Sequence, residues 1–262
     1  MYKTKKKVLV TGCAGFIGFH LCQRLLNSNQ YNVYGLDNLN SYYDVKLKKD
    51  RLRILKKNKK FNFFKINITK KTKLKKNFDK CKYDVVINLA AQAGVRHSIE
   101  YPETYVENNI IGFFNILEAS KNINLKHLIF ASTSSVYGSS NSFPLKESEN
   151  TDAPLSFYAA TKKTNEVLAY SYANIFKLPC TGLRFFTVYG TYGRPDMALF
   201  KFTKLILAGK KIDLFNKGEH HRDFTHVDDI VDGIFKLIKR PSRKEIPFDL
   251  YNIGSDKPEY LK

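Results

Sequence analysis

The chain has 262 residues, of which 43% are hydrophobic and 14% aromatic, with 14 glycines and 8 prolines. This composition predicts a packed, enzyme-sized protein and excludes a disordered, collagen-like or low-complexity chain. There are 44 Lys and Arg against 24 Asp and Glu, a formal net charge of +20. The lysines are spread over surface-type segments such as 56–60 and 70–76, without any nucleic-acid motif among them, so we expect no nucleic-acid partner.

The four cysteines indicate a reducing compartment. Cys13, Cys22, Cys81 and Cys180 form no CxxC pair and have no accompanying histidine cluster, so we expect neither disulfides nor a metal site. The lysine-rich start leads into a short apolar run that a glycine turn interrupts, which argues against a signal peptide. No stretch has the roughly 20 apolar residues of a membrane span. The sequence therefore predicts a cytoplasmic protein without a membrane partner.

Short apolar and β-branched runs alternate with amphipathic stretches along the first two thirds of the chain. The expected strands are residues 7–11, 32–37, 61–68, 84–91, 127–133 and 179–186. The expected helices are residues 16–28, 45–57, 73–79, 103–120 and 156–176. This alternation predicts an α/β fold with a doubly wound parallel sheet of the Rossmann type, which binds ligands at the carboxyl ends of its strands.

Beyond residue 187 the alternation loosens. We expect a helix at 198–208, a short strand at 212–215, a helix at 227–239 and a late strand at 249–254 that rejoins the main sheet. The pattern predicts a dinucleotide-binding domain at residues 1–186 that carries the catalytic residues. A smaller substrate-binding lobe at residues 187–262 would follow it.

A glycine-rich turn follows the first expected strand and opens the first helix. Gly12 permits the tight turn, Gly15 lets backbone N–H groups approach a pyrophosphate, and Gly18 lets the helix pack close to the strand. The N-terminus of the helix adds a partial positive charge beside the phosphates. The spacing is GxxGxxG, so the strand–turn–helix context carries the prediction of a dinucleotide site, which includes Phe16 and Ile17.

Asp37 ends the second expected strand, where a carboxylate accepts hydrogen bonds from the adenosine ribose of a dinucleotide. A 2′-phosphate would be repelled there unless a cation lay beside it. Lys46 and Lys48 are near in sequence but are expected on the next helix. The predicted cofactor is therefore NAD.

The candidate catalytic residues follow the fifth expected strand. Thr133 closes that strand, and Tyr158 and Lys162 are four residues apart on one face of a helix. A tyrosine has an unperturbed pKa of about 10. A neighbouring ammonium and the positive nicotinamide ring favour the phenolate and bring it toward the useful range for a base. We expect Thr133 to hydrogen-bond the same substrate hydroxyl, and Tyr158 and Lys162 to contact the cofactor as well.

In this order, the motifs resemble those of the extended short-chain dehydrogenase/reductases of the nucleotide-sugar epimerase/dehydratase family. The chain most closely resembles the UDP-glucuronate 4-epimerase branch. The resemblance runs along essentially the whole chain, through the glycine turn and residues 37–44, 88–96, 183–190, 193–198 and 222–225. Residues 91–96 and 194–198 are typical of the uronate epimerases, whereas the other motifs are shared more widely.

The resemblance implies further contacts. For the cofactor these are Asn38, Asn67, Ile68, Leu89, Ala90, Ala91 and Asn109, with Asn67 standing where relatives carry an aspartate on the adenine. For a UDP-sugar substrate they are Arg96, Ser134, Ser135, Thr187, Arg194, Met197 and Arg222. Ser134, Ser135 and Thr187 would reach the sugar carboxylate. Arg194 and Arg222 would bind the diphosphate or the ribose, because a guanidinium offers fork-shaped donors to phosphate.

The residues after Thr133 distinguish the branches of the family. Dehydratases and uronate decarboxylases carry an acid there to move a proton at a neighbouring carbon, whereas this chain has Ser134 and Ser135. The resemblance therefore implies NAD-dependent epimerisation of UDP-glucuronate to UDP-galacturonate through a 4-keto intermediate, a step in cell-surface polysaccharide biosynthesis. Two alternatives stay open: a sister epimerase acting on UDP-N-acetylglucosaminuronate or UDP-glucose, and a non-catalytic protein that binds NAD or a nucleotide sugar.

Two further expectations concern the extent and assembly of the protein. Relatives continue beyond the late strand, so we expect the 262 residues to be a fragment that lacks part of the substrate-binding lobe. The resemblance also implies a homodimer, in which helix 103–120 pairs with helix 156–176 across a two-fold axis.

Overall fold

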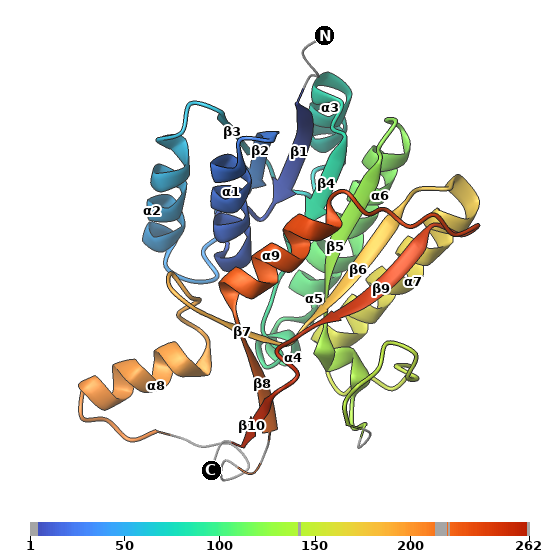
Figure 1. The fold of residues 1–262 in the computed structure, drawn as a ribbon. Helices are drawn as coiled ribbons and strands as arrows, with labels where there is room; N and C mark the ends of the chain where they lie inside the picture. The colour runs from blue at the N-terminus through green and yellow to red at the C-terminus, as the bar shows by residue number, and fades with distance from the viewer. Residues whose placement is uncertain (1–4, 141–142, 213–218, 220, 261–262) are drawn as a thin grey trace.

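The computed structural model describes residues 5–140, 143–212, 219 and 221–260. A seven-stranded parallel sheet with the order β3-β2-β1-β4-β5-β6-β9 forms its larger part (Figure 1). Its strands are β1 (Lys6–Thr11), β2 (Tyr31–Asp37), β3 (Phe61–Lys65), β4 (Val85–Asn88), β5 (His127–Thr133), β6 (Cys180–Phe185) and β9 (Phe248–Ile253). This order confirms the predicted doubly wound α/β fold.

Helices cover both faces of the sheet. One face packs against α1 (Phe16–Ser28), α2 (Val45–Lys56) and α9 (Val227–Leu237), and the other against α3 (Lys71–Cys81), α6 (Gly112–Lys121) and α7 (Phe157–Phe176) (Figure 1). Each face has its own apolar cluster. A parallel sheet buried on both sides explains why its strands are continuous apolar runs in the sequence.

Strand β1 shows how the sequence determines these two clusters. Val8, Leu9 and Val10 are all fully buried. Successive side chains of a strand point to opposite faces, so Val8 and Val10 join the cluster under α1, and Leu9 joins the cluster under α3 and α6. The strand ends at the glycine turn, where Gly12 N donates to the Leu36 carbonyl oxygen at 2.7 Å. The turn is thereby fixed against the end of β2.

Several element boundaries differ from the predicted ones. Strand β3 ends at Lys65 because the Asn67 side chain accepts from Thr69 N at 3.0 Å and starts a turn. The helix expected at 103–120 is divided into α5 (Pro102–Tyr105), a π-helical segment η1 (Val106–Ile111) and α6, and is preceded by a short helix α4 (His97–Glu100). The apolar pattern of this stretch does not distinguish a π-helical segment from an α-helix.

The region after β6 contains a second sheet that the sequence analysis missed. Strands β7 (Thr187–Tyr189), β8 (His221–His226) and β10 (Pro258–Tyr260) form it in the order β10-β8-β7. The late strand does rejoin the main sheet as predicted, since β9 pairs in parallel with β6. The strand expected at 212–215 falls almost entirely on residues outside the described part. The boundary between two domains near residue 186 stays a prediction.

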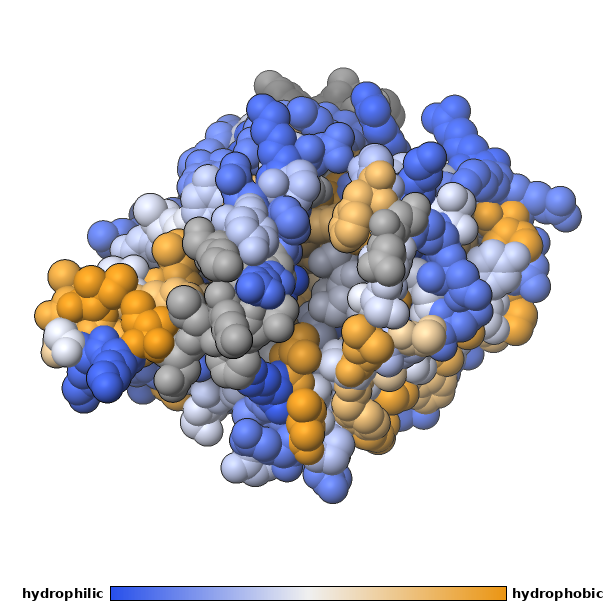
Figure 2. Space-filling model, turned by 90° about the horizontal axis from the view of Figure 1, so that it is seen from below, coloured by the Kyte–Doolittle hydropathy of each residue, from blue (hydrophilic) through white to orange (hydrophobic). Residues whose placement is uncertain are grey.

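Helix α8 (Ala198–Leu207) was predicted at nearly these residues, but it has no buried residue in the described structure. Leu199, Ile206 and Leu207 are 59%, 63% and 84% exposed. Figure 2 shows the apolar surface at the end of the molecule where this helix projects. Among the described residues, no helix is long and apolar enough to cross a membrane.

Candidate active site

A cavity of about 260 Å³ lies at the carboxyl ends of the sheet strands. It brings together most of the residues that the sequence nominated. From the predicted cofactor set these are Gly12, Gly15, Phe16, Ile17, Gly18, Asp37, Asn38, Asn67, Ile68, Leu89, Ala90 and Ala91. From the predicted catalytic and substrate sets they are Thr133, Tyr158, Lys162, Arg194 and Met197.

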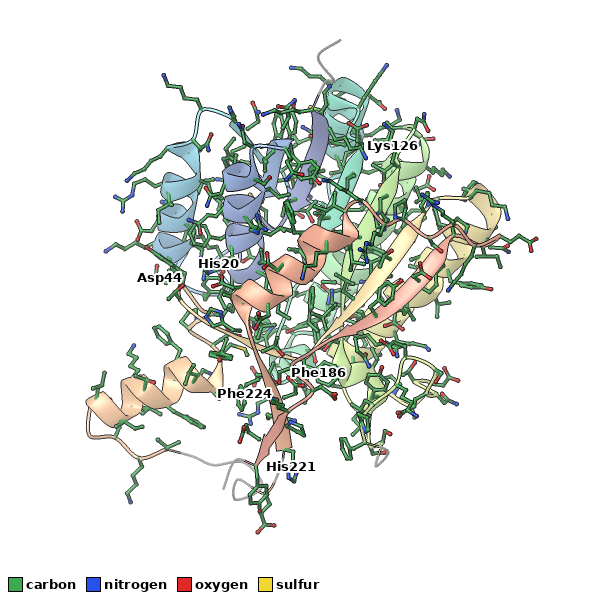
Figure 3. All side chains as sticks on the ribbon, viewed as in Figure 1. His20, Asp44, Lys126, Phe186, His221 and Phe224 are labelled. Carbon is green, nitrogen blue, oxygen red and sulfur yellow. The ribbon has the colours of Figure 1, made fainter. Side chains whose placement is uncertain are left out.

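The other nominated residues lie outside the lining of this cavity. Ser134 and Ser135 directly follow Thr133 in a short 3₁₀ helix η2 (Ser134–Tyr137), and Thr187 lies between the lining residues Phe186 and Val188. Arg96 and Arg222 are exposed, on α4's N-terminal side and on β8. Figure 3 shows Phe186 near the junction of the main sheet with the small one.

Asn109 is buried behind the cavity rather than in its wall. Its Nδ2 donates to the Gln92 carbonyl oxygen and to Thr161 Oγ1, both at 3.0 Å, and its Oδ1 accepts from Gln92 N at 2.8 Å. With these bonds Asn109 fixes the backbone of Gln92, and Gln92 itself lines the cavity. Asn109 therefore supports the loop after β4.

The glycine turn is shaped so that only glycine fits. A Cβ on Gly18 would lie 2.2 Å from the Gly12 carbonyl oxygen, and one on Gly12 would lie 2.9 Å from Ala90 N. Gly12 also has a φ of +69°, a backbone conformation that favours glycine. The turn thus brings bare backbone and the N-terminus of α1 to the cavity, an arrangement that fits the pyrophosphate of a dinucleotide.

Asp37 closes the other side of this part of the cavity. Its Oδ2 accepts from Ala14 N at 3.0 Å and its Oδ1 accepts from Leu39 N at 2.8 Å. Burial raises the pKa of the carboxyl, while these two N–H groups and the cations of Lys48 and Arg51 oppose that shift. The carboxylate is a fixed acceptor at the end of β2, as the ribose of NAD requires.

Tyr158 stands in the first turn of α7, at the cavity wall. The helix begins with Ser156, whose hydroxyl accepts from Ala159 N at 3.1 Å, and Tyr158 N donates to Ser98 Oγ at 3.1 Å. Burial raises the pKa of the Tyr158 phenol, whereas the Arg194 guanidinium and a hydrogen bond with the Thr133 hydroxyl lower it. The effect of burial is the larger, so the pKa of the phenol stays above its ordinary value, and Arg194 and Thr133 offset only part of the rise. The phenol lies in the cavity wall, where it can exchange a proton with a bound ligand.

Lys162 lies one helical turn after Tyr158 and is only 2% exposed. Its ammonium donates to the Ala131 carbonyl oxygen at 3.0 Å, which ties α7 to the end of β5. Burial lowers its pKa to about 8. The Lys162 side chain therefore lines the cavity as a buried amine, which its hydrogen bond to Ala131 holds in place.

Arg194 reaches the cavity from the loop after β7. It forms a two-point ion pair with Asp196, and Tyr42 Oη donates to the same carboxylate at 3.1 Å. Arg194 and Tyr158 line the same cavity, and the guanidinium lowers the pKa of the Tyr158 phenol.

The sequence analysis missed several polar residues of the cavity wall. Asn40, Tyr42, Tyr43 and Gln92 all lie within motifs that carried the family resemblance, so the motifs were the available signal. Lys48 is on α2 as expected, but its ammonium reaches back to Asn40, 2.7 Å from the carbonyl oxygen and 2.5 Å from Oδ1. Lys48 therefore lines the cavity although it belongs to α2.

The parallel sheet, the glycine turn and the Thr–Tyr–Lys group around one cavity define a dinucleotide-binding protein of the short-chain dehydrogenase/reductase class. Residues 8–254 match the model of the NAD dependent epimerase/dehydratase family. The chain belongs to this family, as its motifs predicted.

Named relatives narrow the comparison. The chain is 51% identical to Protein CapI of Staphylococcus aureus, over 97% of this chain and 80% of that protein. It is 46% identical to UDP-glucuronate 4-epimerase of Thermodesulfobacterium geofontis, over 95% of this chain and 75% of that protein. The crystal structure of UDP-glucuronic acid 4-epimerase from Bacillus cereus, in complex with UDP-glucuronic acid and NAD, superposes with a TM-score of 0.90 at 39% identity, covering 97% and 79% of the two chains.

The described part of the chain offers no set of metal ligands. Within residues 5–140, 143–212, 219 and 221–260, no group of three or more His, Cys, Asp and Glu side chains could hold a metal ion. The four cysteines are free and buried.

Proposed function

We propose that the protein catalyses the NAD-dependent 4-epimerisation of UDP-glucuronate to UDP-galacturonate through a 4-keto sugar intermediate. The observation that carries this proposal is the placement of Thr133, Tyr158 and Lys162 in the wall of the same cavity as the glycine turn. The similarity to proteins named UDP-glucuronate 4-epimerases supports the choice of substrate.

The chain's own residues fit the cofactor. The glycine turn and the N-terminus of α1 would bind the pyrophosphate, Asp37 and Asn38 the adenosine ribose, and Tyr158 and Lys162 the nicotinamide half. When bound, NAD supplies the acceptor and donor of the hydride at the sugar C4. Asn67 and Ile68, at the end of β3, would lie against the adenine.

Tyr158 is the proposed base and acid. As a phenolate it would take the proton of the sugar 4-hydroxyl, and it would return that proton after the keto sugar has presented its other face. Thr133 would hold the same hydroxyl, and Lys162 would fix the region through its bond to Ala131. Arg194, which favours the phenolate, would also attract the negative charge of a uronate substrate.

The absence of further acids in the cavity favours epimerisation over elimination or decarboxylation. Asp37 is the only carboxylic acid among the described lining residues, and it lies at the adenosine end. Ser134 and Ser135 occupy the positions where dehydratases of the family carry acids. Hydroxyl groups there could hold a sugar carboxylate without repelling it, whereas no side chain would move a proton at C5.

Incubation with UDP-glucuronate tests the proposal directly. We expect UDP-galacturonate to appear, as followed by ¹H NMR of the anomeric protons, with a preparation that retains its NAD and with no NAD added. Parallel incubations with UDP-glucose and UDP-N-acetylglucosaminuronate identify a sister epimerase. If none of the three is converted while NAD is bound, the non-catalytic alternative replaces this proposal.

We further propose a homodimer formed through α7 and the segment made of η1 and α6. Apolar side chains lie exposed on these elements at Ile111, Phe114, Val167, Tyr170 and Ile175. Such a shared apolar surface suits a two-fold interface. Light scattering should give twice the chain mass, and Val167→Asp should shift the protein to monomer; a monomeric wild-type protein would contradict this proposal.

The proposed location is the reducing cytoplasm. All four cysteines are free and buried, at Cys13, Cys22, Cys81 and Cys180, which supports a protein that does not depend on disulfides.

A further inference from the structure

The loop between β7 and α8 is fastened to the cofactor-binding half through three consecutive carbonyl groups. His20 Nε2 lies 2.8 Å from the Thr191 oxygen. Arg51 NH2 donates to the oxygens of Tyr192 and Gly193 at 2.7 and 3.3 Å. Figure 3 shows His20 at the end of α1 that faces this loop. Two side chains of the Rossmann sheet's helices thus hold the backbone directly before Arg194.

Arg51 also holds the glycine turn. Its NH1 donates to the Ala14 carbonyl oxygen at 2.8 Å and to Tyr43 Oη at 2.7 Å. The side chain is fully buried, and its Nε has no hydrogen-bond partner among the described residues. A buried N–H group without a hydrogen-bond partner is destabilising. Arg51 leaves its Nε unpaired and directs its two terminal nitrogens at the carbonyl oxygens of the turn and the loop. One residue therefore joins the pyrophosphate turn to the loop of Arg194.

A second connection runs from the cofactor side to Arg194 itself. Tyr42 follows Asp37 and Asn40 along the cavity wall, and its hydroxyl donates to Asp196 Oδ2 at 3.1 Å. Asp196 in turn pairs with both Nε and NH2 of Arg194. Because a two-point pair fixes the plane of a guanidinium, Asp196 and Tyr42 determine where Arg194 points.

We propose that Arg51, together with Tyr42 and Asp196, couples the dinucleotide site to the substrate site by positioning the Arg194 loop. The inference rests on the proposed function and adds three positioning residues to it. Ordering of the glycine turn by a bound dinucleotide would be transmitted through Arg51 to residues 191–193. The loop would then hold Arg194 in place before a UDP-sugar arrives.

Coupling of this kind is reciprocal. If NAD strengthens the binding of a UDP-sugar by some factor, the UDP-sugar must strengthen the binding of NAD by the same factor. A purely structural role for Arg51 would lower stability without linking the two affinities. The coupling factor therefore separates positioning from structural support.

The experiment measures UDP-glucuronate binding by titration calorimetry to the NAD-loaded and the NAD-free protein. The wild-type protein should bind UDP-glucuronate about tenfold more tightly when NAD is present, the size of a typical coupling. Tyr42→Phe removes one hydrogen bond to a charged group and should raise the dissociation constant and KM about tenfold, with a smaller effect on kcat. Arg51→Lys should reduce the coupling factor to near one.

Matched variants serve as controls. Arg53→Lys changes an exposed arginine on the same helix, and Tyr34→Phe changes a tyrosine of β2 whose ring stacks on Phe64 outside the cavity. Both should keep the wild-type coupling factor. Should Arg51→Lys fail to fold, the comparison of Tyr42→Phe with Asp196→Asn still tests the second connection, since their effects should not add.

The outcomes also separate this inference from the proposed function. If the wild-type protein converts UDP-glucuronate but its binding is equally tight with and without NAD, the coupling is wrong and the epimerase proposal stands. An unchanged KM and coupling factor in Tyr42→Phe and Arg51→Lys would overturn the positioning roles. If the wild-type protein shows coupled binding without conversion, the epimerase proposal fails and the coupling stands.

Discussion

Helices α1 and α8 differ in how the described structure surrounds them. Seven of the 13 residues of α1 are buried, against β1 and β2 and beside α9. None of the ten residues of α8 is buried, although the helix is richer in apolar residues. The first helix belongs to a closed two-sided core, and the second presents its apolar side to solvent in the described chain.

This difference indicates which parts of the molecule fix the positions of the site residues. The glycine turn, Asp37 and the Thr133–Lys162 group are all placed by buried strands and the helices packed on them. The region after β6 reaches the cavity through loops, and side chains of the Rossmann half hold those loops in place. Changes in the first region should therefore have larger effects than changes in the second.

The largest effect is expected from Tyr158→Phe. Removal of the phenol oxygen leaves no proton acceptor beside Thr133, so kcat should fall about a thousandfold, within the usual range for a general acid–base group. The melting temperature and the NAD content should stay close to those of the wild type. A variant with more than a tenth of the wild-type kcat would remove Tyr158 from the catalytic role.

The two helices can be compared directly by truncating one leucine in each. Leu25 in α1 is fully buried, so Leu25→Ala should lower the free energy of unfolding by about 3 kcal/mol. Leu207 in α8 is 84% exposed, and Leu207→Ala should change it by less than about 0.5 kcal/mol. Urea denaturation measures both. Equal losses would mean that α8 is packed in solution, against a partner or against chain outside the described residues.

Two glycines provide a smaller and more local contrast. Gly18→Ala forces a Cβ within 2.2 Å of the Gly12 oxygen and should cost about 2 kcal/mol, together with the loss of bound NAD. Gly233 in α9 has room for a Cβ, whose nearest neighbour would be 3.8 Å away. Gly233→Ala should therefore stabilise by up to about 1 kcal/mol through helix propensity. Thermal unfolding and NAD absorbance after denaturation give both readouts.

The last prediction concerns the dependence of stability on pH, to which His127 contributes. This histidine is fully buried between β5 and β6, where Nε2 meets Thr181 Oγ1 at 2.8 Å, and burial lowers its pKa to about 4. In the unfolded chain the pKa of a histidine is about 6.5. The contribution of neutral, buried His127 to the free energy of unfolding is therefore complete above that pH. It is lost as the pH falls toward 4, by up to about 1.4 kcal/mol per pH unit. His127→Gln should flatten this part of the stability curve relative to wild type.

The sequence predicted the sheet well because buried parallel strands carry a strong and local signal. Val8, Leu9 and Val10 are apolar without alternation, and such a run directly before Gly12 is typical of a strand covered on both faces. Order and spacing along the chain predict the three glycines of the turn, Asp37, Thr133, Tyr158 and Lys162 as site residues. All of them line the cavity.

What the sequence did not predict depends on contacts between distant segments. The pairing of β7 with β8 and of β8 with β10 joins short polar strands that have no periodic pattern of their own. The effect of Arg194 on Tyr158 depends on how one loop folds over the cavity. Lys48 was assigned to a helix correctly, but the length of its side chain decides that it reaches Asn40.

The return of β9 to the main sheet also has a consequence for biosynthesis. Strand β6 pairs with β5 on one side and with β9 on the other, and β9 begins only at Phe248, long after β6 ends at Phe185. Until β9 has been synthesised, one edge of β6 has no strand to pair with. Its free N–H and C=O groups could then pair with a strand of another nascent chain. Binding of chaperones to the nascent chain should therefore be strongest after β6 has been synthesised and should end when Phe248–Ile253 emerges.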